Sequence, residues 1–328
     1  GVTISELDSI PGGIGLTAWL NETYAAMGDE VIGGATGMID GFATAFPDED
    51  ILISRESADY QPEMEWLAER LRALPGAPPR HVMNPWNLTP PELTGSAIYR
   101  FLELFDLDNV ELSPELLRYA EAGELTVTPP LKAFMEEKLW LALFWSPHLE
   151  DWWLERLGGE DVELLRRCIP RGWVVDPEPL PPFAEYPGLN ISAWDELRSF
   201  GGRERQLVLK ISGFSERGWG SRGVFIGHDL SQEQWSAAID EALESYPHHP
   251  YVLQVFHRAR VVTHPAWNGE SAIVTHPKSR VRLCPYYFAT EAEKDEVSLG
   301  GVLATVCPAD KKILHGMRDA MMLPCVER

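Results

Sequence analysis

The segment Gln206–Gly227, QLVLKISGFSERGWGSRGVFIG, constrains the fold more than any other part of the chain. Two apolar runs of β-prone residues, Leu207–Ile211 and Val224–Ile226, flank a turn that is rich in glycine. Strand-forming runs on both sides of such a turn predict a β-hairpin. Other elements must therefore pack around an antiparallel pair of strands.

The turn of this hairpin matches the spacing G-x-G-x-x-G at Gly218, Gly220 and Gly223. In a dinucleotide-binding fold this spacing opens a helix, whereas here a strand follows. Between two strands it is typical of a flap whose backbone N–H groups approach the phosphates of ATP, with Lys210 able to meet a phosphate oxygen. An ordinary glycine-rich hairpin with a surface lysine explains the same residues, so both interpretations stay open.

A helix and a strand are predicted after the hairpin. Residues Ser231–Tyr246 combine a capping box with apolar residues at helical spacing. Tyr251–His257 predicts a strand that ends near Gln254, Val255 and Phe256. The backbone of such a strand can read the edge of an adenine ring while apolar side chains enclose it.

The order of flap, helix and strand is similar to that of the ATP-grasp fold. The segment Ser5–Gly13, SELDSIPGG, with Thr17 after it, resembles the E-x-N-T-x-P-G motif that closes D-alanine–D-alanine-type ATP-grasp ligases, yet here it precedes the other motifs. This order resembles the circularly permuted ATP-grasp proteins that are similar to glutathionylspermidine synthetase. Segments 97–103, 136–142 and 300–305 follow in the order expected for that group, so the resemblance spans nearly the whole chain.

The resemblance implies an α/β fold, namely an ATP-grasp fold in circularly permuted order with a Rossmann-like substrate lobe. Alternating helix and strand patterns in residues 14–108 independently predict an α/β lobe. The expected domains are a metal-binding strand of the ATP-grasp core, a Rossmann-like substrate lobe, a helical and proline-rich linking lobe, and a nucleotide-binding lobe, at residues 1–13, 14–112, 113–190 and 191–328. Within the linking lobe, the proline-rich residues 170–190 predict an extended connector.

The resemblance also implies roles for individual residues. The nucleotide would be held by two lysines, the flap glycines and the last strand residues: Lys138, Lys210, Gly218, Gly220, Gly223, Gln254, Val255 and Phe256. Catalytic roles would fall to Arg100, Lys210 and Arg282, with Arg282 facing the γ-phosphate. The residues alone leave alternatives, because a helix lysine such as Lys138 is often solvated and Arg100 can equally form an ion pair with Glu103.

Glu6 and Asp8 are the predicted metal ligands. Two residues apart on an extended segment, they point to one face, and Mg²⁺ is typically bound by one or two carboxylates together with phosphates. From the residues alone, two solvated acids at the terminus are the favoured explanation. Relatives carry Asn at the position of Asp8, and their first metal carboxylate lies on a strand before this motif. This sequence starts after that strand, so either an upstream segment is missing or the site is incomplete.

The function implied by the resemblance is that of an ATP-dependent carboxylate–amine, or peptide-type, ligase acting through an acyl phosphate, with ATP and Mg²⁺ as cofactors. Catalysis would consist of positioning and charge neutralisation. The alternative is a catalytically inactive ATP-grasp-like domain that binds a nucleotide or serves as a scaffold, which the missing metal carboxylate favours. A protein kinase is less consistent with the sequence, because it has no H-R-D or D-F-G segment.

Charge and hydrophobicity limit the partners. A formal net charge of −22 opposes binding to the phosphate backbone of nucleic acids. Because the sequence has no apolar run of membrane-spanning length and no features of a signal peptide, we expect a cytoplasmic protein that does not insert into membranes. Its 4 cysteines are scattered, as expected for free thiols in a reducing compartment. The expected partners are small-molecule carboxylates and amines, whose identity the sequence does not specify, nor does it specify the oligomeric state.

Overall fold

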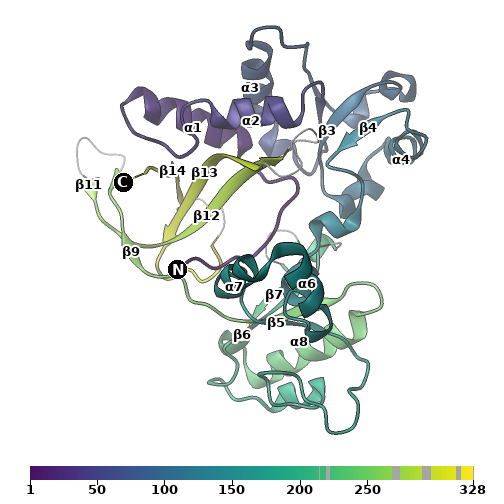
Figure 1. Ribbon diagram of the computed structural model, residues 1–328, viewed down its shortest axis with the longest axis vertical. Coiled ribbons are helices and arrows are strands. Elements are labelled where there is room, and N and C mark those ends of the chain that lie inside the picture. The colour runs from purple at the N-terminus through teal and green to yellow at the C-terminus, as the bar shows by residue number, and fades with distance from the viewer. Residues whose placement is uncertain (214, 219–221, 268–273, 290–296, 315–318, 328) are drawn as a thin grey trace. The chain divides into compact units, whose positions relative to one another are not determined.

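A computed structural model describes residues 1–213, 215–218, 222–267, 274–289, 297–314 and 319–327 (Figure 1). The chain forms two compact units. Unit 1 consists of Gly1–Ser9 and Lys132–His257, and unit 2 consists of Ile10–Leu131 and Arg258–Arg328. Each unit therefore combines segments that are distant in the sequence, and residues 191–328 are divided between the two.

Unit 1 contains a four-stranded antiparallel sheet with the order β5-β8-β6-β7. Its strands are β5 (Gly172–Val175), β6 (Leu207–Ile211), β7 (Val224–Ile226) and β8 (Tyr251–Val255). The predicted hairpin is thus confirmed as β6 paired with β7. Residues 172–175, predicted as part of an extended connector, instead form an edge strand, because the alternate residues Trp173 and Val175 are buried in the core.

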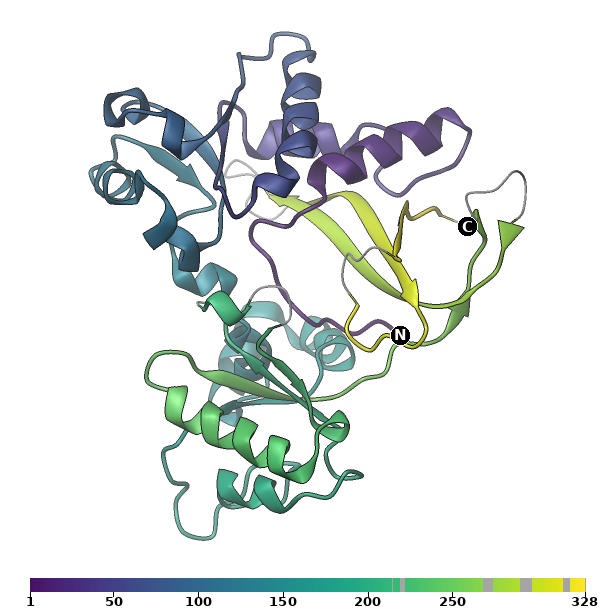
Figure 2. The same cartoon turned by 180° about the vertical axis from the view of Figure 1, so that it is seen from behind.

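Helix α8 (Gln232–Ser245) covers one face of this sheet (Figure 2). Its predicted capping box is confirmed, because Ser231 and Gln234 each accept a hydrogen bond from the other's backbone N–H. Trp235 and Ile239 of the helix are fully buried in a core cluster with alternate residues of the strands, including Leu209. Burying these apolar side chains contributes the main stabilisation of this layer.

Three further helices of unit 1 are α5 (Leu139–Leu143), α6 (Glu150–Leu157) and α7 (Gly159–Cys168). They share a core cluster that contains Phe144, Trp145 and Trp153 and also receives Ile4 from the N-terminal segment. Other aromatic residues of this region are more exposed, since Phe134 and Trp152 retain 50% and 46% of their accessible surface. The aromatic-rich helices thus bury part of their rings and leave the rest at the surface of the unit.

Unit 2 contains a four-stranded parallel sheet with the order β2-β1-β3-β4. Its strands are β1 (Asp50–Ile53), β2 (Val82–Met83), β3 (Ala97–Phe101) and β4 (Thr126–Thr128). Helix α3 (Gln61–Arg72) connects β1 to β2, and α4 (Ser113–Glu121) lies between β3 and β4 in the sequence. Parallel strands with helical connections confirm the predicted Rossmann-like α/β arrangement.

A second sheet of unit 2 is antiparallel, with the order β14-β13-β12-β9. Its strands are β9 (Val262–Thr263), β12 (Lys278–Ala289), β13 (Val297–Pro308) and β14 (Met321–Pro324). Two further short strands, β10 (Ala266–Trp267) and β11 (Val274–Thr275), pair antiparallel. The strand predicted at residues 280–288 is confirmed, as part of β12.

Helix α1 (Ile14–Ala26) lies against β13 and β14, and helix α2 (Gly37–Ala45) lies against β12 and β13 (Figure 1). One core cluster links these helices and α3 to both sheets, with Ile51 and Tyr99 from the parallel sheet and Tyr286 and Leu303 from the antiparallel sheet. This apolar layer joins the two sheets of unit 2, and a second core cluster, which contains Leu52 and Ile98, lies on the other face of the parallel sheet.

The N-terminus of α1 shows how unit 2 fixes a glycine turn. Gly13 precedes the helix with φ +88°, a conformation that favours glycine. The carboxylate of Glu63 accepts hydrogen bonds from the N–H groups of Gly13, at 2.8 Å, and Leu16, at 3.1 Å. Burial raises the pKa of Glu63, and these two hydrogen bonds oppose that rise. Glu63 thus caps a helix other than its own.

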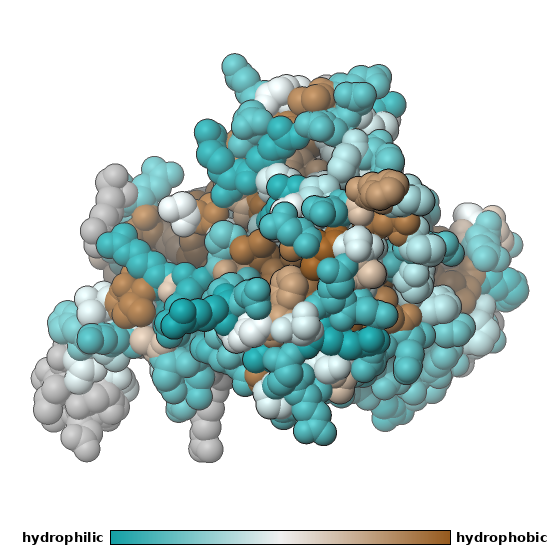
Figure 3. Space-filling view, turned by 90° about the horizontal axis from the view of Figure 1, so that it is seen from below, coloured by the Kyte–Doolittle hydropathy of each residue, from teal (hydrophilic) through white to brown (hydrophobic). Residues whose placement is uncertain are grey.

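Short 3₁₀ helices occur between the main elements, at Ala58–Tyr60, Pro85–Asn87, Pro90–Leu93, Leu104–Asn109, Ala133–Glu136, Pro147–Leu149, Trp194–Ser199, Glu216–Gly218 and Gly227–Asp229. Hydrophilic side chains predominate on the face shown in Figure 3, and hydrophobic ones occur there in small groups. No helix within the described ranges is both long and apolar enough to cross a membrane.

Candidate functional site

The sheet of unit 1 has one apolar face and one face that carries polar side chains. Residues paired across an antiparallel sheet point to the same side, and side chains alternate along each strand. The pairs Val208–Gln254 and Lys210–Val252 therefore point away from the face that α8 covers. We call this second surface the polar face of unit 1.

Lys210 is the central cation of the polar face. Its side chain is partly buried, and its ammonium group donates a hydrogen bond to the carbonyl oxygen of Ser5 at 3.1 Å. Burial lowers the pKa of Lys210 from 10.5 to about 8, the carboxylate of Glu6 raises it, and the ammonium group of Lys138 lowers it further. The carboxylate of Glu6 thus offsets only part of the cost of burying the Lys210 ammonium group.

Lys138 is the second cation, and it comes from a different part of unit 1. It stands at the N-cap of α5, and its side chain is 10% exposed. The Lys138 ammonium group lies 2.9 Å from a carboxylate oxygen of Glu6 and 3.5 Å from the carbonyl oxygen of Gly218. The structure therefore brings Lys138, Lys210, Glu6 and the base of the flap together, and their predicted roles toward a nucleotide and a metal ion stay predictions.

The segment that carries Glu6 and Asp8 forms no strand in the described structure, unlike the prediction for residues 1–13. It is held instead by the bond from Ile4 N–H to the Cys168 carbonyl oxygen, at 2.8 Å, and by the lysine contacts. In the part of the chain that the structure describes, no group of three or more His, Cys, Asp or Glu side chains is arranged to hold a metal ion. Metal binding by Glu6 and Asp8 stays a prediction.

The flap is described only in part, because Gly220 lies outside the described residues. A side chain at Gly223 would bring its Cβ within 2.3 Å of Ile211 and 2.9 Å of the Arg217 carbonyl oxygen. Gly223 is therefore required by packing at the base of the hairpin, whatever ligand the flap covers. At the same base, the Ser212 hydroxyl group donates a hydrogen bond to Glu137, the neighbour of Lys138.

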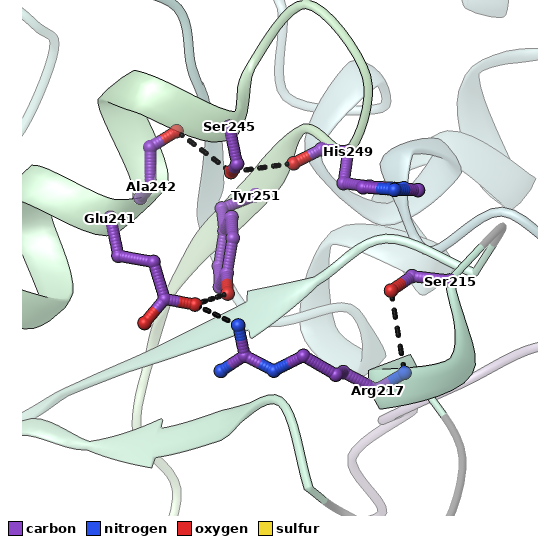
Figure 4. A network of polar contacts seen from close by, with 7 residues as sticks. All are labelled: Ser215, Arg217, Glu241, Ala242, Ser245, His249 and Tyr251. Carbon is purple, nitrogen blue, oxygen red and sulfur yellow. Dashed lines mark hydrogen bonds and ion pairs between the residues drawn. The ribbon is translucent and has the colours of Figure 1, made fainter.

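A second polar network ties the flap to α8 (Figure 4). Arg217, in the flap, forms an ion pair with Glu241 of α8, and the Tyr251 hydroxyl group of β8 donates to the same carboxylate at 2.6 Å. Burial raises the pKa of Glu241, but the hydrogen bonds from Arg217 and Tyr251 and the charge of Arg217 more than offset it, so that the pKa is lowered. The ionised carboxylate anchors this end of the flap.

The end of β8 offers fewer backbone donors than the sequence suggested. The Val255 N–H group donates to the Arg171 carbonyl oxygen and the Phe256 N–H group to the Gln206 carbonyl oxygen, each at 2.9 Å. Adenine recognition through these two N–H groups would require both hydrogen bonds to be given up. The Gln254 side chain, in contrast, lies on the polar face and is 1% exposed.

Two predicted catalytic arginines lie in unit 2. Arg100 is fully buried in β3 and donates hydrogen bonds to the carbonyl oxygens of Pro129 at 2.9 Å and Leu102 at 2.7 Å, so it stabilises the end of the parallel sheet. Arg282 is partly buried in β12, opposite Thr305 of β13. Their predicted roles toward a substrate or a phosphate stay predictions.

Sequence reasoning missed Ser5, Glu137 and the pairing of Arg217 with Glu241. Glu137 is adjacent in the sequence to Lys138, the lysine predicted to bind phosphate, and this adjacency could have singled out Glu137 as a residue of the site. The carbonyl oxygen of Ser5 and the ion pair depend on contacts between distant segments, for which a single sequence contains no signal.

Comparisons with known proteins support the fold. No protein-family model matches the chain, and no curated protein matches it. Among solved structures, the chain is similar to a glutathione synthetase-like effector, GSS30, from Globodera pallida in its apo form. The TM-score is 0.50 with 11% sequence identity, and the match covers 99% of this chain and 70% of that chain.

At this identity the likeness shows the fold alone. It confirms the predicted mixed α/β fold of the ATP-grasp-like, glutathione synthetase type. It does not support the predicted circular permutation, which stays a prediction. The chain thus has the fold of glutathione synthetase-like proteins.

Proposed function

We propose that this protein binds ATP on the polar face of unit 1 and acts as an ATP-dependent ligase that joins a carboxylate to an amine. The observation that carries the proposal is the approach of Lys138 and Lys210 to a single carboxylate, that of Glu6. Two lysines with one exposed acid between them favour a polyanion such as a nucleotide phosphate. The ATP-grasp-like fold supports the same ligand.

The reaction class requires positioning and charge neutralisation rather than a protein nucleophile. The terminal phosphoryl group of ATP would pass to a carboxylate oxygen, leaving ADP, and an amine would then displace phosphate to form an amide. Lys138 and Lys210 would hold the phosphates, and the flap between β6 and β7 would cover them. A charged hydrogen bond of this kind contributes about 1.5–3 kcal/mol, or about one to two decades in affinity.

The residues present fit Mg²⁺ only as a partner of the nucleotide. Mg²⁺ is usually held by one or two carboxylates together with substrate phosphates. Glu6 is the carboxylate in position, and Asp8 follows it, but no three-residue group in the described ranges completes a site. Glu6 and Asp8 would thus hold a metal ion that arrives with the phosphates, and its charge would further neutralise them.

One observation favours a second candidate function, nucleotide binding without turnover. Glu6, the acid nearest the lysines, is engaged in an ion pair with Lys138 instead of standing free for a metal ion. A protein with this arrangement can bind a nucleotide through its lysines and yet fail to organise the metal for phosphoryl transfer.

Two measurements separate these functions. Calorimetry with MgATP tests binding, with Lys138→Met and Lys210→Met as variants and the exposed Lys278→Met as the matched control. Phosphate release is then measured with pools of amino acids, peptides and polyamines. Turnover with any pool supports the ligase, and binding without turnover in all pools supports the second candidate. No binding of MgATP by the unmodified protein contradicts both.

A further inference from the structure

The loop that follows β5 in unit 1 exposes a whole aromatic ring. Phe183 is 105% exposed, and its φ of +68° lies in the left-handed region that residues other than glycine rarely adopt. The Ala184 N–H group donates to the Pro181 carbonyl oxygen at 3.0 Å and closes a β-turn around Phe183. Proline before a residue of positive φ is typical of a type II turn, in which glycine usually holds the position of Phe183. Strain and exposure of this kind point to a function of the side chain outside the core.

The two ends of this loop are held by one side chain, that of Trp194. Its indole N–H group donates to the Asp176 carbonyl oxygen at 2.7 Å, and its ring contacts the ring of Tyr186, with 4.0 Å between the centroids. Trp194 itself is 4% exposed and belongs to the core cluster that contains the apolar face of α8. The loop is thus anchored to the core of unit 1 at both ends, and Phe183 extends from a fixed base.

Proline determines the backbone just before Phe183, in the segment Pro179-Leu-Pro-Pro182. Three of these residues have φ fixed near −65°, and Leu180 and Pro181 are further restricted because each precedes a proline. Such a backbone favours the polyproline II conformation, and the segment is neither helix nor strand, with its three prolines exposed. Pro179 and Pro182 are one polyproline II turn apart, so their rings lie on the same edge. This is the P-x-x-P spacing that aromatic-lined grooves bind.

We infer that Pro179–Phe183 is a docking segment for a partner protein whose groove is lined by aromatic side chains, as in SH3, WW and EVH1 domains. The edge formed by Pro179 and Pro182 lies in the groove, and the Phe183 ring fills an apolar pocket at its end. Because the prolines and the anchored base fix the segment before binding, little conformational entropy is lost when the partner binds.

Charge defines the partner further. Glu178 and Glu185 are exposed on either side of the segment, so basic residues beside the groove complement it. The same two acids oppose insertion of Phe183 into a membrane with anionic lipids. The inference concerns a surface loop and does not depend on the proposed nucleotide site.

The test measures dissociation constants by calorimetry between the full chain and a panel of purified SH3, WW and EVH1 domains with basic residues beside the groove. The variants are Phe183→Ala, Phe183→Gly and the double change of Pro179→Ala with Pro182→Ala. Phe134→Ala, at a half-exposed phenylalanine of unit 1 outside the loop, is the control. We expect at least one domain to bind the unmodified chain and the control equally well. The three variants should bind it at least about tenfold more weakly, the loss of one interface anchor.

Phe183→Gly separates binding from folding. Glycine adopts a positive φ without strain, so this variant should be at least as stable to urea as the unmodified chain and still lose the partner. If no domain of the panel binds the unmodified chain, or if the variants bind as tightly as the control, the inference is overturned. Binding of the unmodified chain to phosphatidylcholine vesicles that Phe183→Ala abolishes, without binding to any domain, would assign the ring to a membrane and overturn it as well.

Discussion

Replacing Lys210 by methionine should stabilise the ligand-free protein at pH 7. Methionine fills a similar volume and removes the ammonium group from a partly buried position. The pKa of Lys210 falls from 10.5 to about 8, mainly through burial, so the folded state disfavours the charged form. At 1.36 kcal/mol per pKa unit, this fall corresponds to about 3 kcal/mol. Since the side chain is partly exposed, we expect a gain of about 1–3 kcal/mol.

The pH dependence of this gain has a definite sign. Below pH 8 the lysine is charged in both states, and the folded state bears the full cost. Between pH 8 and 10.5 the unfolded chain binds a proton that the folded protein has released, so the stability of the unmodified protein rises with pH. Above pH 10.5 the lysine is neutral in both states, and the gain disappears.

Urea unfolding of the two proteins at pH 7, 9 and 10.5 measures this difference directly. Lys278→Met, at an exposed position of β12, is the control and should show no comparable gain. A destabilising effect of Lys210→Met at pH 7 would refute the reasoning. So would a gain that stays constant up to pH 10.5.

Three further predictions concern the carboxylates. Glu63→Ala should lower the free energy of unfolding in urea by about 1–2 kcal/mol, because two N–H groups at the start of α1 lose their capping carboxylate. The control Glu65→Ala, which like Glu63 lies on α3, should have little effect, and equal effects of the two changes would contradict the capping role. Glu6→Gln should strengthen ATP binding without Mg²⁺ by up to about fivefold, the equivalent of about 1 kcal/mol for an ion pair whose carboxylate is half exposed. Weaker calorimetric binding would contradict this. Mg²⁺ alone should give no saturable heat of binding at concentrations at which MgATP saturates, and tight binding without nucleotide would show a complete metal site.

The parts of the fold that the sequence predicted well have strong local patterns. The hairpin of β6 and β7 has apolar strands around a glycine-rich turn, and α8 has both a capping box and a helical repeat of buried residues. Such elements follow from local chemistry, because each residue's preference agrees with its neighbours. The edge strand β5 was harder, since four residues between prolines are too few to show an alternating pattern against their surroundings.

The candidate site was predictable only in its composition. The resemblance singled out Lys138, Lys210 and Glu6, and the structure brings these three together. The partners that determine their state were not predictable, because Ser5 offers only a backbone carbonyl and the burial of Lys210 depends on packing by distant segments. The hydrogen bonds that engage the backbone N–H groups of Val255 and Phe256 likewise depend on contacts between distant segments, which the sequence does not specify.

The most direct test of the account is calorimetry of MgATP binding at pH 8 in two buffers with different enthalpies of ionisation. Lys210 has a pKa of about 8, so at this pH its side chain is uncharged in about half of the protein molecules. Contact with a phosphate should restore the positive charge. We predict an uptake of about half a proton per bound nucleotide in the unmodified protein and none from this residue in Lys210→Met, together with a loss of at least about tenfold in affinity. Equal proton uptake and equal affinity in the two proteins would show that the phosphates do not bind at Lys210 and would contradict the account.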